Sequence, residues 1–130
     1  MKAVIDTNIL VSALWKPMGN AYSILVNVIA GKIMPCYDSR MMEEYREVLL
    51  RPKFRFTAAQ VDDLLTIFKM NGISVIPTPI LVSMEDEDDR PFYEVAKYCN
   101  VPLITGNIRH FPTDELIMTP ADFCRTYLIA

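Results

Sequence analysis

The chain has 130 residues, of which 52% are hydrophobic and 22% are charged, and its formal net charge is −3. This length is typical of one compact domain with a single core, so we expect one domain over residues 1–130. The composition excludes a disordered chain, and the acidic balance argues against a generally basic surface for nucleic acid. A metal-dependent enzyme acting on phosphates is not excluded, because bound divalent cations invert the local charge of an acidic pocket.

Strand-like and helical patterns alternate along the chain, which predicts an α/β fold. We expect three layers, α/β/α, around a central and mostly parallel sheet. In chain order, the predicted elements are a strand over 1–5, a helix over 20–30, a strand over 32–37, a helix over 39–51, a helix begun by the capping box Thr57 and Gln60 and ending at 71–72, and an extended segment over 74–76. They continue with a helix whose core face is marked by Phe92, Val95, Ala96 and Cys99, strands over 101–104 and 116–118, and a last helix that opens at Thr119-Pro120.

The lengths of the apolar stretches and the spacing of the cysteines suggest a cytoplasmic protein. No apolar stretch is long enough to span a bilayer, and Asp6 interrupts the first apolar run too early for a secretory signal. Cys36, Cys99 and Cys124 are widely spaced and form no Cys-x-x-Cys pair, which favours buried thiols. Zinc binding is disfavoured because His110 is the single histidine.

Asp6 directly follows the first predicted strand. The carboxyl ends of parallel strands border the functional crevice of such a sheet, so this carboxylate is a candidate site residue. Aspartate is also a preferred N-cap, and a cap on the next helix is an equally good interpretation of Asp6 alone.

Two further acids occupy positions where burial competes with solvation. Glu44 lies on the flank of the apolar stripe of the helix over 39–51, although snorkelling or an ion pair with Arg40 or Arg51 explains this position slightly better. Five acids at 85–89 exceed what a helix N-terminus needs, and Asp89 is spaced to point along the sheet-facing side. Three carboxylates from separate elements predict a site for Mg²⁺ or Mn²⁺, which can activate water for phosphodiester hydrolysis.

A local basic run follows the helix over 39–51. It consists of Arg46, Arg51, Lys53 and Arg55, with two phenylalanines interleaved. These residues are candidates for RNA binding, and a solvated helix end that complements the helix dipole is an equally good interpretation.

The order of motifs resembles that of PIN-domain nucleases over nearly the whole chain. The motifs are residues 4–14, residues 44–49, residues 86–89 with Phe92 and Ala96, and Thr105-Gly106-Asn107 with residues 110–112. The chain is most similar to stand-alone bacterial and archaeal proteins described as toxin components of toxin–antitoxin pairs, of the VapC type.

This resemblance implies a Mg²⁺- or Mn²⁺-dependent endoribonuclease that is restrained by an antitoxin protein and forms a homodimer. By motif, the metal-site acids are Asp6, Glu44 and Asp89, and the polar residues near them are Thr7, Asn8 and Thr105. The predicted helix over 20–30 agrees with self-association, since it is apolar over most of its circumference.

One position departs from the family pattern. PIN domains commonly carry an aspartate after Thr-Gly, whereas this chain has Asn107, which can ligate a metal only as a neutral amide. Asp86 or Asp114 could compensate, although both are more simply loop residues. The alternative function is therefore a catalytically weakened or inactive PIN-like domain that binds RNA or a protein partner. A phosphoacceptor domain ranks lower, because no lysine follows Asn107.

Overall fold

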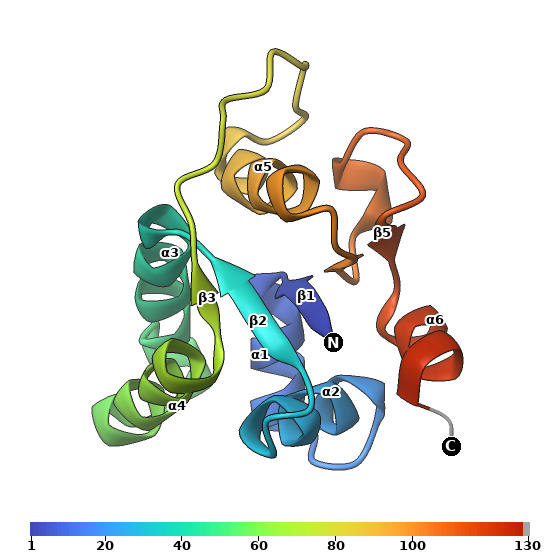
Figure 1. Cartoon of the computed structure of the whole chain (residues 1–130). Coiled ribbons are helices and arrows are strands. Elements are labelled where there is room, and N and C mark those ends of the chain that lie inside the picture. Colours follow the sequence, from blue (N-terminus) through green and yellow to red (C-terminus); the bar gives the residue numbers. More distant parts are fainter. Residues whose placement is uncertain (129–130) are drawn as a thin grey trace.

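The structure is a computed structural model that describes residues 1–128, and its centre is an all-parallel sheet with the strand order β3-β2-β1-β4-β5 (Figure 1). The strands are β1 (Lys2–Ile5), β2 (Met34–Tyr37), β3 (Ile73–Ser74), β4 (Leu103–Ile104) and β5 (Ile117–Met118). β1 is thus the central strand, with β2 and β4 as its hydrogen-bonded neighbours.

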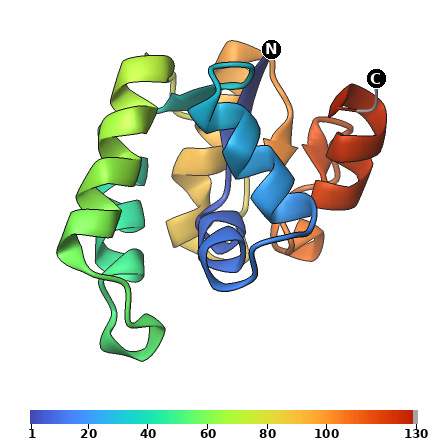
Figure 2. The same cartoon turned by 90° about the horizontal axis from the view of Figure 1, so that it is seen from below.

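The helices form the outer layers. They are α1 (Thr7–Trp15), α2 (Asn20–Ile29), α3 (Ser39–Leu49), α4 (Ala58–Asn71), α5 (Arg90–Cys99) and α6 (Pro120–Phe123), with 3₁₀ turns η1 (Pro52–Phe54), η2 (Glu87–Asp89) and η3 (Ile108–His110) and a π-helical turn η4 (Cys124–Leu128). α5 covers one face of the sheet and α1 and α2 the other, with α3 and α4 beside them toward the β3 edge (Figures 1 and 2). The predicted three-layer α/β/α fold is confirmed, and its sheet is wholly parallel.

α1 is the element that the sequence analysis did not predict. Its buried positions Thr7, Ile9, Leu10 and Ala13 have helical spacing, but the helix has nine residues and follows β1 with only Asp6 between them. The apolar run of the strand therefore continues almost unbroken into the helix, which hides the change of period from two to 3.6. The predicted capping box at Thr57 and Gln60 is present in α4.

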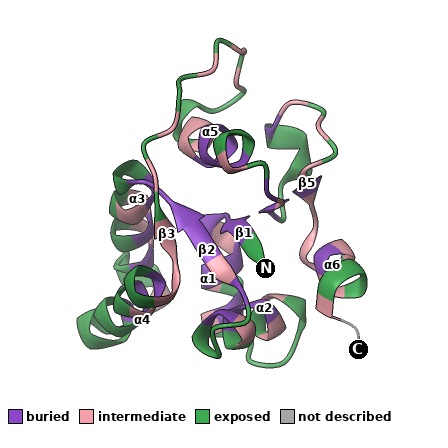
Figure 3. Cartoon of the chain, viewed as in Figure 1, coloured by how far each residue is buried: buried purple, intermediate pink, exposed green. Residues whose placement is uncertain are grey.

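The core lies on both faces of β1, whose residues 3–5 are fully buried (Figure 3). Tyr45 of α3 stands edge-to-face against Phe68 and Phe92, with ring centroids 5.5 and 5.9 Å away. Its hydroxyl group donates to the carbonyl oxygen of Ile5. This hydrogen bond fixes α3 against the carboxyl end of β1, and it therefore also places the neighbouring residue, Glu44.

A buried ion-pair network braces the opposite side of α3. The Arg40 guanidinium contacts Asp38 at 2.6 Å and Glu94 at 2.9 Å, and both carboxylates are buried. Glu94 also accepts a hydrogen bond from the N–H of Ile80 at 2.9 Å, so the network ties α3 and α5 to the segment after β3. The sequence analysis found no role for these acids.

The remaining expectations concern cysteines and membranes. Cys36 is buried, Cys99 and Cys124 are half-buried, and all three are free thiols. Over residues 1–128, no helix is long and apolar enough to cross a membrane.

Candidate active site

Asp6 lies at the carboxyl end of the central strand and is also the N-cap of α1, as the alternative interpretation predicted. Its Oδ1 accepts a hydrogen bond from the N–H of Thr7 at 2.8 Å, and its Oδ2 accepts one from the Thr105 hydroxyl at 2.7 Å. Burial raises the pKa of the Asp6 carboxyl, and these two hydrogen bonds partly offset the rise. The carboxylate is thus held in one orientation by a donor from the first residue of α1 and a donor from the residue after β4.

The polar residues after β4 complete this support. Thr105 is fully buried, and its Oγ1 also accepts a hydrogen bond from the N–H of Asn107 at 3.0 Å. The N–H of Gly106 approaches Oδ1 of Asn8 at 3.4 Å. Asn107 itself is exposed and lines the rim of the same cavity as Asp6.

Glu44 reaches the site from α3. It is half-buried and accepts a hydrogen bond from the hydroxyl group of Thr7. The ion pairs considered for Glu44 are made by other acids, because Arg40 contacts Asp38 and Glu94, and Arg51 contacts Glu47. Burial raises the pKa of the Glu44 carboxyl, and the negative charge of Asp6 adds to the rise while the Thr7 hydrogen bond lowers it.

Asp89 stands at the N-terminus of α5. Its Oδ2 is buried and has no hydrogen-bond partner among the described residues. The Nδ1 of His110 lies 3.6 Å from this oxygen, beyond hydrogen-bonding distance. Burial raises the pKa of Asp89 to about 7, with further contributions from the charges of Asp6 and Asp86.

These three acids line one cleft with a volume of about 430 Å³. Thr7, Asn8 and Asn107 from the motifs and Arg51 from the basic run share its lining, and Thr105 donates a hydrogen bond to Asp6. Further lining residues were not assigned a site role from the sequence: Val11, Ser12, Val48, Phe54, Asp88 and His110. His110 enters through the 3₁₀ turn η3, and such a turn carried no periodic signal in the sequence.

Asp86 and Asp114, which were considered as replacements for a family aspartate at position 107, lie in different places in the structure. Asp86 lines the cleft. Asp114 does not line it, since it accepts hydrogen bonds from Tyr93 at 3.0 Å and from Lys97 at 2.8 Å on the outer side of α5.

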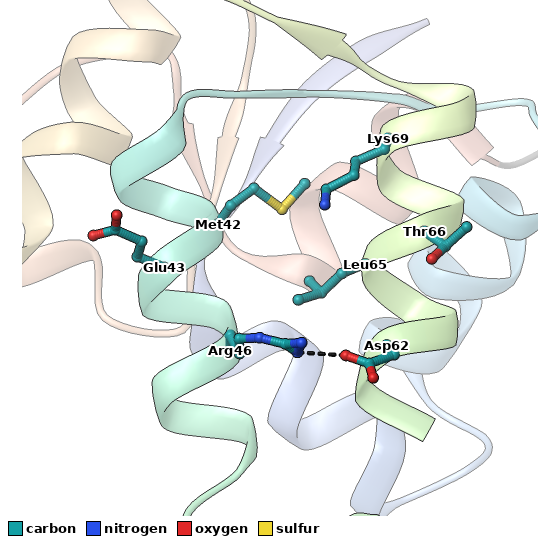
Figure 4. A pocket seen from close by; sticks show the side chains of 7 residues that line it. All are labelled: Met42, Glu43, Arg46, Asp62, Leu65, Thr66 and Lys69. Atoms are coloured by element: carbon teal, nitrogen blue, oxygen red, sulfur yellow. Dashed lines mark hydrogen bonds and ion pairs between the residues drawn. The ribbon is translucent and has the colours of Figure 1, made fainter. Parts of the chain in front are cut away.

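The residues of the basic run also lie in different parts of the structure. Arg46 pairs with Asp62 in a separate groove between α3 and α4, so it is directed away from the acidic cleft (Figure 4). Arg51 lines the cleft, and Lys53 and Arg55 are exposed in the connection between α3 and α4. This connection projects from the body of the molecule (Figure 2).

The donor atoms suit a hard divalent cation, although the side chains are not drawn together around one. Within residues 1–128, no three histidine, cysteine or acidic side chains are grouped closely enough to hold an ion. The oxygens nevertheless belong to carboxylates and an amide, the ligands that Mg²⁺ and Mn²⁺ prefer, and Oδ2 of Asp89 lacks any partner among these residues. Binding by all three acids therefore requires Glu44 and Asp89 to move toward Asp6.

Comparison with known proteins agrees with this arrangement. The model of the PIN domain family matches residues 2–109, and the chain belongs to this family. A similar protein is the uncharacterized protein MJ1680 of Methanocaldococcus jannaschii, which is 31% identical over 110 residues, covering 82% of this chain and 71% of the relative. No solved structure matches the chain. PIN domains are generally nucleases that use divalent metals, which supports a nuclease.

We predict that Asp89→Asn stabilises the metal-free protein. The folded-state pKa of Asp89, about 7, exceeds the ordinary aspartate value of 3.8, so the stabilising effect of the neutral form is complete below pH 4 and is lost as the pH rises through 7. Asparagine stays neutral, and no side-chain cap is lost because Asp89 makes none. The gain should be about 1–2 kcal/mol, or roughly 3–6 °C in Tm, at pH 8 and vanish near pH 4.

Thermal unfolding in EDTA at both pH values measures this effect. Glu85→Gln is the matched control, since it removes an exposed charge from the same acidic segment. Equal Tm values for native protein and Asp89→Asn at pH 8 would contradict the claim that this carboxylate is repelled and desolvated.

Proposed function

We propose that this chain is a Mg²⁺- or Mn²⁺-dependent endoribonuclease. The observation that carries the proposal is the buried, unpartnered Oδ2 of Asp89 in the same cleft as Asp6 and Glu44. These carboxylates come from three elements, and the charge of Asp6 raises the pKa values of Glu44 and Asp89, an arrangement that costs stability unless a cation neutralises it. The family membership supports nuclease chemistry for such a cleft.

Each of these side chains would have a distinct role in the proposed reaction. Asp6, Glu44 and Asp89 would bind the metal, with Asn107 as a neutral ligand at the rim. Thr105 and Thr7 would hold Asp6 and Glu44 in orientation through the hydrogen bonds described above. A bound divalent ion lowers the pKa of water and stabilises charge on the leaving oxygen. Arg51, Lys53 and Arg55 would attract the phosphates of the RNA toward the cleft.

We also propose the biological setting that the motif resemblance implies. In this proposal, residues 1–130 form a single cytoplasmic PIN domain that acts as the toxin of a toxin–antitoxin pair, and a partner protein restrains it. The single sheet formed within residues 1–128 supports the one-domain part of this proposal, and the detection of an antitoxin-like reading frame beside the gene would test the toxin assignment.

Replacement of a metal-site acid should abolish cleavage. Asp6→Asn can keep its Thr7 contact, and its amide can donate to Thr105 Oγ1 if that hydroxyl rotates, so the fold should survive while the charge is lost. We expect Asp6→Asn and Asp89→Asn to lower Mn²⁺-stimulated RNA cleavage at least about 100-fold, since each removes a ligand from the ion that activates water.

Gel analysis of a labelled single-stranded RNA measures cleavage, and circular dichroism monitors the fold. Glu47→Gln is the control, because Glu47 is an exposed acid on the same helix as Glu44. Undiminished cleavage by either variant in the presence of EDTA would overturn the metal assignment. If the native protein cleaves no RNA with either metal, the nuclease proposal fails. The alternative, a domain that binds RNA or a protein partner without cleaving RNA, then remains.

Asn107→Asp should strengthen metal binding. The substitution restores the charge that PIN domains commonly carry here, and ion affinity depends on the number of anionic ligands. We expect the dissociation constant for Mn²⁺ to fall about tenfold, or about 1.4 kcal/mol, and the metal-free protein to lose stability through added repulsion. Calorimetric titration measures both forms, and equal affinities would place Asn107 outside the coordination sphere.

We further propose a homodimer through α2. Ile24, Leu25 and Val28 of this helix are buried, whereas Val26 is 42% and Ile29 is 52% exposed. Light scattering at micromolar concentration should give twice the monomer mass, and Val26→Glu should reduce it to the monomer mass. Leu81→Glu is the control, since Leu81 is fully exposed in the segment after β3. A monomeric native protein would contradict the proposal.

A further inference from the structure

An aromatic cluster extends the acidic cleft at the end of α1. The Trp15 ring meets the Phe54 ring edge-to-face with centroids 5.1 Å apart, and Phe54 is stacked with Phe56 at 5.9 Å and an interplanar angle of 14°. Phe54 lines the cleft together with Val11 and Ser12 of α1. Trp15 follows these two residues by four and three positions, so it continues the same side of the helix.

Packing within the protein leaves much of this cluster uncovered. Trp15 is 55% exposed, while Phe54 and Phe56 are half-buried in the connection between α3 and α4. A tryptophan that served only to anchor this connection would be expected to bury most of its ring, because the gain comes from apolar area removed from water. The exposed part of the indole is therefore available to another flat, apolar group.

The charges around the cluster are positive, in contrast to the acidic part of the cleft. Lys16 and Arg55 are exposed beside it in sequence, and the Lys53 Nζ lies 5.1 Å from the centre of the Phe54 ring. None of these three cations forms an ion pair within residues 1–128, unlike Arg46 and Arg51. Unpaired cations next to exposed aromatic rings match a nucleic-acid strand, whose phosphates are anionic and whose bases offer flat π-faces.

We propose that Trp15, braced edge-to-face by Phe54, is a stacking platform for an unpaired base of a single-stranded nucleic acid that runs into the acidic cleft. The platform deepens the proposed function and rests on it for the choice of RNA. Bases inside a duplex are stacked on their neighbours and cannot present a face to the indole, so the platform selects single strands. Lys16, Lys53 and Arg55 hold the adjoining phosphates without reading sequence.

Trp15 is the one tryptophan of the chain, and its fluorescence therefore reports on the platform directly. The first experiment titrates native protein in EDTA with decauridine, with a ten-base-pair RNA duplex, and with an abasic decamer that has the same number of phosphates. Decauridine should quench the emission, whereas the duplex and the abasic chain should leave it nearly unchanged. Absence of quenching at saturating decauridine, or equal quenching by the abasic chain, would overturn the proposal.

The second experiment measures binding of fluorescein-labelled decauridine by anisotropy, also in EDTA. Trp15→Ala should weaken binding about tenfold, since stacking on one aromatic ring contributes roughly 1–3 kcal/mol per base. Trp15→Phe should retain most of the affinity. Tyr98→Ala is the matched control, because Tyr98 is also 55% exposed but lies in the last turn of α5, outside the cleft lining.

The outcomes separate this proposal from the proposed enzyme. Neither measurement needs a metal ion or cleavage, so quenching by decauridine together with absent cleavage would support the platform and reject the nuclease. Metal-dependent cleavage that survives Trp15→Ala, with unchanged decauridine affinity, would reject the platform and keep the nuclease. An effect of Trp15→Ala confined to dimer mass would assign the cluster to a protein contact and overturn the proposal.

Discussion

The structure depends on the placement of one carboxylate, Asp6, at the end of its central strand. A charged group loses hydration energy there, and the fold compensates with donors from Thr7 and from Thr105, 99 residues further along the chain. Thr105 can reach Asp6 only because β1 and β4 are neighbours in register, with Ile5 opposite Ile104. The orientation of the Asp6 carboxylate therefore depends on the sheet order, because a change in strand order would remove the Thr105 donor and leave only the N–H of Thr7.

The other acids differ from Asp6 in how completely the protein satisfies them. Asp6 has two donors, Glu44 has one, and Oδ2 of Asp89 has none within the described residues. The carboxylate nearest the central strand is thus fixed, while those brought by α3 and α5 keep oxygen lone pairs without donors among the described residues. Such partial satisfaction costs stability, and sites that bind ions or react commonly accept that cost.

The sequence determined the fold class because strands and helices alternate with clear caps, but it did not reveal α1, whose apolar run joins that of β1. It also identified Asp6, Glu44 and Asp89 as acids in desolvated positions, and the structure places all three in one cleft. The spacing of residues along the sequence could not show in which direction each side chain points. Arg46 and Arg51 belong to one basic run, yet Arg46 faces α4 and Arg51 the cleft. His110 and Phe54 reach the cleft through short 3₁₀ turns, which have no periodic pattern to detect.

α1 connects the two chemical environments of the cleft. Its N-cap is Asp6, and its last residue is Trp15, so nine helical residues, about 14 Å of helix axis, separate the acidic part from the aromatic and basic part. A short helix is stiff, and both ends of this one are held by tertiary contacts: Asp6 by Thr105 and Trp15 by Phe54. The distance between the proposed metal-binding end and the proposed base-binding end is then set by the length of α1. A nucleic-acid strand bound at one end would reach the other with its phosphate at a position set by this helix.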